Sequence, residues 1–173
     1  MEVRQANADD WEELRKLRLR ALTDAPDAFS STLEQEAAYP AEVWQRWAEG
    51  GPASADFIAR EGGASIGMAA ILAESSVPGR MQLVAMWVDP HDRRRGVALA
   101  LIDQALRWAR YRHAHEVILW VADQNSAACR LYERIGFRPT GARQPLPSNP
   151  ARTESLLRLS LGDSLQTPGQ QVP

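Results

Sequence analysis

The segment that best predicts the fold of this chain is Val88-Asp89-Pro90-His91-Asp92-Arg93-Arg94-Arg95-Gly96-Val97-Ala98. The residues before it, 81–88, are nearly all apolar, which is typical of a central strand covered on both faces. The residues after it, 96–112, carry apolar side chains at helical spacing and predict a helix. The segment is therefore a basic loop between a buried strand and the start of a helix.

The physics of such a loop favours a phosphate ligand. The first turn of a helix has N–H groups without partners and the positive end of the helix dipole, and such ends bind phosphate. Gly96 has no side chain and lets a ligand approach the backbone closely. Arg93, Arg94 and Arg95 add positive charge, so a diphosphate is the expected guest. The alternative for three consecutive arginines is a run that merely faces solvent.

The remaining elements follow outward from this segment. Helices are expected at residues 8–23, 41–49 and 96–112, and from Asn125 to a left-handed cap at Gly136. Strands are expected at residues 2–5, 55–60, 64–72, 81–88, 117–122, 137–142 and 153–161. A turn is expected at residues 34–38, and residues 144–151, with three prolines, are expected to form a loop. This order predicts an α/β fold in which helices cover both faces of a mixed sheet.

The charge of the chain bears on its partners. The formal net charge is -2, whereas a nucleic-acid binder usually has a basic excess that neutralises phosphates. No nucleic-acid partner is therefore expected. The first helix has one basic face, which is expected to face solvent and which carries Arg15, Lys16, Arg18 and Arg20.

Length and composition limit the architecture further. The chain has 173 residues, which suits a single domain, expected at 1–161. Residues 162–173 are polar with two prolines and are expected to form a flexible tail. Cys129 is the only cysteine, which excludes an internal disulfide and suits a cytoplasmic location. No stretch approaches the ~18 apolar residues of a membrane span, so no membrane association is expected.

Two motifs in the second half resemble those of the GNAT acetyltransferase superfamily. Arg93-x-x-Gly96-x-Ala98 resembles its Arg/Gln-x-x-Gly-x-Gly/Ala motif. Residues 125–137 resemble its Asn-x-x-Ala-x-x-Leu-Tyr-x-x-x-Gly-Phe run. The close resemblance covers residues 80–142. It implies a twisted, mostly antiparallel sheet of about six to seven strands with two splayed central strands and helices on both faces.

The resemblance also implies a cofactor and its site. The cofactor is acetyl-CoA, which fills the gap between the splayed strands like an additional strand. Backbone groups of Met86, Trp87 and Val88 would then bind the pantetheine arm. The diphosphate would be held by the backbone amides of Arg93, Arg94, Arg95, Gly96, Val97 and Ala98. Asn125 would contact the pantetheine or the backbone of the coenzyme, Tyr132 would lie near the thioester sulfur, and no metal is implied.

The chemistry of amide formation needs the same groups. The leaving thiolate benefits from a proton, and the Tyr132 hydroxyl is a candidate general acid. A backbone N–H near Val88 could stabilise negative charge on the carbonyl oxygen. The alternatives are that Tyr132 is a core residue at helical spacing and that Asn125 is a helix N-cap, although Asn125 could do both.

The usual base of the superfamily is missing. Some relatives place a Glu five residues before the motif Asn, where this chain has Trp120. The candidate substitutes are a chain of water molecules and the side chains of Glu34, Glu36, Asp123 and His115. A lowered pKa of the bound amine could also remove the need for a strong base.

These observations lead to one function and its alternatives. The chain is expected to acetylate a primary amine of a small molecule or a peptide by direct attack of the amine. The acceptor site would be walled by residues 24–50 and 144–151, and Phe29 with Glu34 and Glu36 would suit a cationic amine. The alternative is a CoA-binding regulatory or sensor module of the same fold. A third reading, a protein- or nucleic-acid-binding module, is disfavoured by the net charge, and a homodimer is an open alternative to a monomer.

Overall fold

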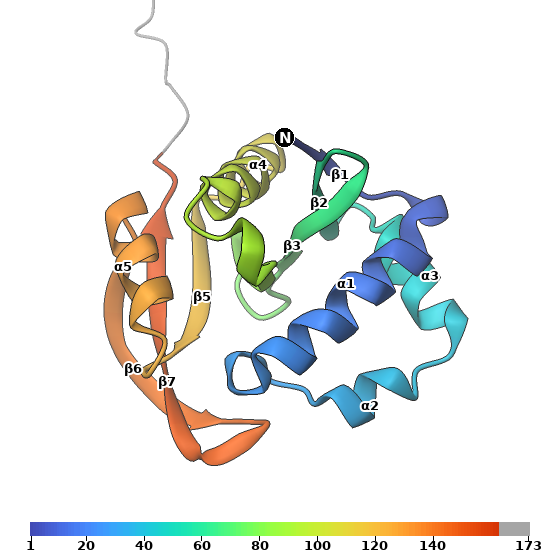
Figure 1. Ribbon diagram of the computed structural model, residues 1–173. Helices are drawn as coiled ribbons and strands as arrows, with labels where there is room; N and C mark the ends of the chain where they lie inside the picture. The colour runs from blue at the N-terminus through green and yellow to red at the C-terminus, as the bar shows by residue number, and fades with distance from the viewer. Residues whose placement is uncertain (163–173) are drawn as a thin grey trace, which may run out of the picture.

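The computed structural model describes residues 1–162, which contain one seven-stranded sheet with helices on both faces (Figure 1). In chain order the strands are β1 (Glu2–Gln5), β2 (Ser54–Glu61), β3 (Ala64–Ala73), β4 (Arg80–Val88), β5 (Glu116–Ala122), β6 (Arg138–Leu146) and β7 (Asn149–Ser160). Across the sheet the order is β1-β2-β3-β4-β5-β7-β6, and β4 and β5 run parallel while the other pairs are antiparallel. The predicted mixed, mostly antiparallel sheet is confirmed. The predicted tail lies outside the described residues except for Gly162.

The helices form two layers, one on each face of the sheet. One layer contains α1 (Trp11–Asp24), α2 (Leu33–Ala37) and α3 (Ala41–Glu49), and the other contains α4 (Val97–Tyr111) and α5 (Ser126–Ile135) (Figure 1). Short 3₁₀ turns occur at Ala8–Asp10, Pro26–Ala28 and Pro90–Asp92. The helices predicted at residues 41–49, at 96–112 and after Asn125 match α3, α4 and α5 closely, because their caps and apolar stripes are local features of the sequence.

Strand alternation divides the interior into two cores. On β2, Ala55 and Phe57 belong to the core that contains α4, whereas Ile58 belongs to the core that contains α1. Successive side chains of a strand point to opposite faces, so Asp56 lies on the α1 face with Ile58. The cavity described below is on this face.

The central strands separate along their length. β4 and β5 pair only from Arg80 to Gln82 and from Glu116 to Ile118. Beyond these residues β4 pairs only with β3, and β5 pairs with β7. The register between β3 and β4 shifts between Met68 and Ala70, opposite Ala85, whose φ of 54° is left-handed. This bulge bends β4 where the gap to β5 opens.

The segment 144–151, predicted to be a loop, is instead the end of a β-hairpin. β6 extends to Leu146 and β7 begins at Asn149, so only residues 147 and 148 turn the chain. Proline cannot donate a backbone hydrogen bond and is therefore tolerated on edge strands. β6 is the edge strand of the sheet, which explains why Pro139 and Pro145 fit there. The turn predicted at residues 34–38 is also wrong, because Leu33–Ala37 is helical and capped by Thr32.

Candidate active site

The backbone of the basic loop is open to a ligand. Among residues 1–162, none of the N–H groups of residues 93–99 donates a hydrogen bond to a protein acceptor, and the first amide of this region that does is that of Ala100, to Gly96 O at 3.0 Å. Gly96 is the N-cap of α4 with φ 86°, and a Cβ placed on it would meet no atom within 4 Å. Arg94 is also left-handed, with φ 63°. The loop thus carries a row of free donors at the positive end of a helix dipole.

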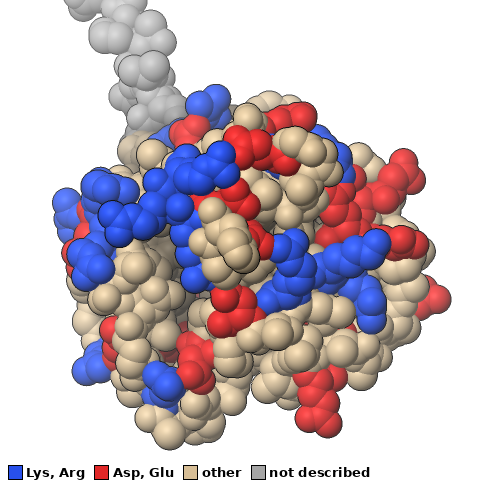
Figure 2. All heavy atoms as spheres, viewed as in Figure 1, with Lys and Arg blue, Asp and Glu red and all other residues tan. Residues whose placement is uncertain are grey.

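The three arginines of the loop have different roles. Arg93 Nε donates to Val88 O at 3.0 Å, and its guanidinium also pairs with Asp24. Arg95 pairs with Glu61 at 2.6 Å and with Asp92. Arg94 is exposed and forms no ion pair within the described part of the chain. Figure 2 shows that basic side chains gather over the start of α4 and toward α5, with a second group over α1.

The end of β4 lies beside this loop. Trp87 is 5% exposed, packs in the core that contains α1, and donates from Nε1 to an Asp24 carboxylate oxygen at 2.9 Å. Met86 and Val88 contact the core on the α4 side. The residues predicted to bind pantetheine therefore sit on the part of β4 that has no β5 partner.

Tyr132 and Asn125 both belong to α5. Tyr132 is 7% exposed, packs edge-on against Phe137 with ring centroids 5.7 Å apart, and belongs to the core on the α4 side. Burial raises the pKa of Tyr132, so its phenol stays protonated at neutral pH. The side chain of Asn125 accepts from Ala128 N at 3.1 Å and caps the helix. Its amide nitrogen forms no hydrogen bond within residues 1–162.

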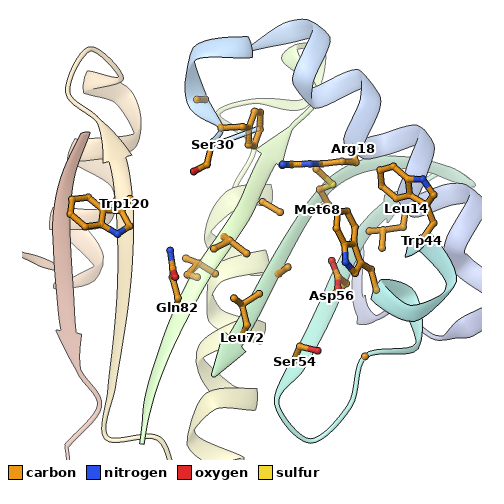
Figure 3. A pocket seen from close by; sticks show the side chains of 18 of the residues that line it. Leu14, Arg18, Ser30, Trp44, Ser54, Asp56, Met68, Leu72, Gln82 and Trp120 are labelled. Atoms are coloured by element: carbon orange, nitrogen blue, oxygen red, sulfur yellow. The ribbon is translucent and has the colours of Figure 1, made fainter. Parts of the chain in front are cut away.

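A cavity of about 560 Å³ opens on the other face of the sheet. Its lining includes Gln82 to Ala85 on β4 and Trp120 on β5, so it borders the gap between these strands from both sides. Figure 3 shows Gln82 and Trp120 on the two strands, which converge at one end and separate at the other. The aromatic residues of the lining are Phe29, Trp44, Trp47 and Trp120, and the charged ones are Arg18, Arg46, Asp56 and Glu154.

The chain matches the sequence profile of the Acetyltransferase (GNAT) family over residues 11–137, which is more than half of its length. The chain belongs to the GNAT acetyltransferase family. The resemblance inferred from the two motifs is therefore confirmed. Acetyl-CoA is the cofactor of this family, and the free amides of residues 93–99 and the open space at Gly96 fit its diphosphate.

Curated GNAT relatives share part of the sequence. A Mycobacterium tuberculosis protein named "Probable N-acetyltransferase Rv2775" is 31% identical over 119 residues, which are 65% of this chain and 59% of that protein. A mycothiol acetyltransferase of Thermobispora bispora is 32% identical over 132 residues, which are 74% of this chain and 43% of that protein. The chain thus spans 59% or less of the length of these two relatives.

Solved GNAT structures share the fold. An acetyltransferase of Streptococcus pneumoniae has a TM-score of 0.78 at 19% identity and covers 93% of this chain and 99% of its own. YncA of Salmonella typhimurium, solved with its cofactor acetyl-CoA, has a TM-score of 0.71 at 20% identity and covers 98% of both chains. At these identities the likeness concerns the fold alone.

The bases considered from the sequence have little access to the cavity of this GNAT chain. Glu36 is 2% exposed and accepts from Arg18 Nη2 at 2.6 Å and Arg18 Nε at 2.8 Å. Glu34 and His115 are exposed and are not among the residues that line the cavity. Hydrogen bonds from Ser155, Thr153 and Arg143 lower the pKa of Asp123 to about 2, which makes it a poor proton acceptor.

Two predictions about the acceptor site need correction. Arg18, expected on a solvated helix face, is turned inward, pairs with Glu36, and lies over the Phe29 ring at 4.5 Å. The hairpin residues 144–151 do not line the cavity but support its wall, since Asn149 Nδ2 donates to Asp27 Oδ1 at 2.9 Å. Residues 28–30 do contribute to the lining, as do Trp44, Arg46, Trp47 and Gly50.

Sequence reasoning missed the carboxylates that do face the cavity, Asp56 and Glu154. Burial raises the pKa of Asp56 to about 7, and the nearby Arg18 charge opposes that rise. Glu154 is 4% exposed and accepts from Gln144 Nε2 at 2.7 Å. The alternation of side chains along β2 could have placed Asp56 on the face of the sheet that Ala55 and Phe57 do not share. It could not have placed Asp56 in a cavity, because the other walls come from α1 and α3, which are distant in sequence.

Two further findings concern the part of the chain that the structure describes. None of its helices is long and apolar enough to cross a bilayer. Within residues 1–162, no cluster of three or more His, Cys, Asp or Glu side chains is arranged to hold a metal ion.

Proposed function

We propose that this chain transfers the acetyl group of acetyl-CoA to a primary amine of a small molecule or peptide by direct attack of the amine. The observation that carries the proposal is the gap between β4 and β5, which separates two different surfaces. On one side lie the free amides of residues 93–99 and the buried phenol of Tyr132. On the other lies the cavity lined by β2 to β5, α1 and α3.

The cofactor would be held by backbone groups more than by side chains. The amides of residues 93–98 would bind the diphosphate, with the free side chain of Arg94 adding charge. Backbone groups of Met86, Trp87 and Val88, on the unpaired part of β4, would bind the pantetheine arm. The amide nitrogen of Asn125, left free by the N-cap bond, would contact the same arm. Acetyl-CoA supplies the acetyl group as a thioester.

The protein supports the reaction through donors of two kinds. A backbone N–H at the end of β4, near Val88, would donate to the carbonyl oxygen as negative charge develops there. Tyr132 would donate its proton to the departing sulfur, and its raised pKa keeps the phenol protonated at neutral pH before that step. The amine nitrogen loses a proton as the amide forms, and a chain of water molecules would carry that proton to solvent, from which Tyr132 is protonated again. The aromatic cavity admits the amine in its neutral form more readily than as a solvated cation.

The proposal is tested by two measurements on the whole chain. Calorimetry should detect acetyl-CoA binding, and no heat at millimolar cofactor with folded protein would overturn the proposal. A thiol-release assay with a panel of amines should detect turnover above the rate without amine. Binding without turnover on any amine would favour the CoA-binding regulatory module, for which Trp120 in place of an acid is the supporting observation. A cytoplasmic location and a homodimer stay predictions.

A further inference from the structure

One carboxylate that lines the cavity, that of Asp56, has no partner in the described part of the chain. Asp56 makes no side-chain hydrogen bond or ion pair within residues 1–162, whereas Glu154 is held by Gln144 at 2.7 Å. The positive charge that lowers the pKa of Asp56 is that of Arg18. This guanidinium is already paired with buried Glu36 at 2.6 Å. Figure 3 shows Asp56 on β2 among the side chains that line the cavity. A partly buried carboxylate without a partner is costly in its charged form, so either a proton or a cationic ligand stabilises it.

The position of Asp56 in the sheet separates it from the site of acetyl transfer. Asp56 pairs with Ala70 on β3, and Ala70 pairs with Val84 on β4, next to the bulge at Ala85. Neighbouring strands lie about 4.8 Å apart, so the Cα atoms of Asp56 and Val84 are roughly 10 Å apart. A general base must come within about 3 Å of the proton it removes. Asp56 therefore cannot reach an amine that reacts at the gap between β4 and β5.

The space between these two points suits an apolar chain. Met68 and Ala70 line the cavity floor between Asp56 and Val84, and Phe29 and Trp44 contribute aromatic walls. Aromatic rings tolerate a cation at their faces better than aliphatic walls do. Among the other charged residues that line the cavity, Arg46 is exposed.

We propose that the acceptor is a diamine-like molecule, whose one amine reacts at the gap between β4 and β5 while a second cationic group binds Asp56. The two nitrogen atoms are joined by an apolar chain that crosses the cavity floor. This inference rests on the proposed acetyl transfer and assigns Asp56 to substrate selection rather than to proton removal.

The electrostatics of Asp56 give the inference a pH dependence. Burial raises the pKa of the free carboxyl to about 7, opposed by Arg18. Above that pH Asp56 is charged and attracts a second ammonium group, and below it Asp56 takes up a proton and loses the attraction. The preference for diamines over monoamines should therefore weaken as the pH falls from 8 to 6.

The test compares unbranched terminal diamines with monoamines of equal length in the thiol-release assay at saturating acetyl-CoA. In the wild-type chain kcat/KM should favour the diamine at least tenfold at an intermediate chain length and less at shorter and longer ones. Asp56→Asn should bring the ratio of diamine to monoamine close to one. Asp103→Asn, which removes an exposed carboxylate on α4, is the matched control and should keep the wild-type ratio.

The outcomes separate the two proposals. If amines are acetylated but diamines never exceed monoamines, or if Asp56→Asn keeps the preference, the inference is overturned and acetyl transfer stands. If acetyl-CoA binds but no amine is acetylated, acetyl transfer fails and the inference fails with it. Should Asp56→Asn not fold, as judged by circular dichroism, the length profile of the wild-type chain decides: a steady rise with length, without a diamine optimum, refutes the inference.

Discussion

Replacing Gly96 by Ala separates what the basic loop needs for folding from what a diphosphate needs for binding. Gly96 has φ 86°, and an added Cβ would meet no atom within 4 Å. The cost to the free protein therefore comes from the left-handed backbone alone, about 1 kcal/mol. For a chain of this size that lowers the midpoint of thermal unfolding by about 2–4 °C.

A matched control has the same backbone strain but no role in the proposed site. Gly141 on β6 has φ 89° and likewise open space around a Cβ. Gly141→Ala should lower the unfolding midpoint about as much as Gly96→Ala does. Any difference between the two variants in cofactor binding then reports on the loop rather than on stability.

Only Gly96→Ala should weaken acetyl-CoA binding. Its methyl group would occupy the surface where the free amides of residues 93–99 would face the proposed diphosphate. Losing one hydrogen bond to a charged group costs about 1.5–3 kcal/mol, which corresponds to roughly a 10- to 100-fold higher Kd. Calorimetric titration of both variants measures this directly. Equal Kd values for the wild-type chain, Gly96→Ala and Gly141→Ala would refute the assignment of the loop to the diphosphate.

Three further changes test the site and its surroundings. Tyr132→Phe should lower turnover about 100-fold with Kd for acetyl-CoA within about twofold, as expected on loss of a general acid; unchanged turnover in the thiol-release assay would remove Tyr132 from that role. Glu36→Gln should leave the inward-turned Arg18 without its carboxylate and lower the free energy of unfolding in urea by about 3 kcal/mol. Asp103→Asn, at an exposed pair, should change that free energy by less than about 1 kcal/mol. Similar losses in both variants would contradict the buried pairing of Arg18 with Glu36. Hydrogen bonds hold the pKa of Asp123 at about 2, so the stabilisation from its carboxylate is complete above about pH 5 and is lost as the pH falls toward 2. The difference in unfolding free energy between the wild-type chain and Asp123→Asn should therefore shrink over that range. A constant difference would contradict a stabilising role of the charged Asp123 carboxylate.

Local signals predicted the elements to which we assign cofactor binding. Helix α5 begins at its N-cap Asn125 and ends at Gly136 with φ 116°, both of which the motif predicts. The loop before α4 follows from an apolar strand, a stretch of arginines and a glycine within a few residues. Such features depend on hydrogen bonds and backbone preferences between near neighbours, so the sequence suffices to predict them.

Predictions that depended on distant partners were less successful. The prolines of residues 144–151 favour a loop locally, yet the segment forms a hairpin because β6 is an edge strand and Leu146 is buried to 1%. Arg18 was expected to face solvent on its helix, but its side chain is turned inward and is only 12% exposed, because Glu36, from a separate helix, supplies its counter-charge. Neither outcome can be read from the residues next to these positions.

The order of the elements, the helix caps, the basic loop and the family of the chain can all be inferred from its amino-acid sequence. Three features become visible only in the folded chain: the point where β4 leaves β5, the position of the cavity on the face opposite Tyr132, and the lack of a partner for Asp56 among residues 1–162. The physical reason is the range of the interactions. Periodicity and capping act within a few residues of the chain, whereas the burial and charge environment of a side chain are set by strands and helices that are far from it in sequence.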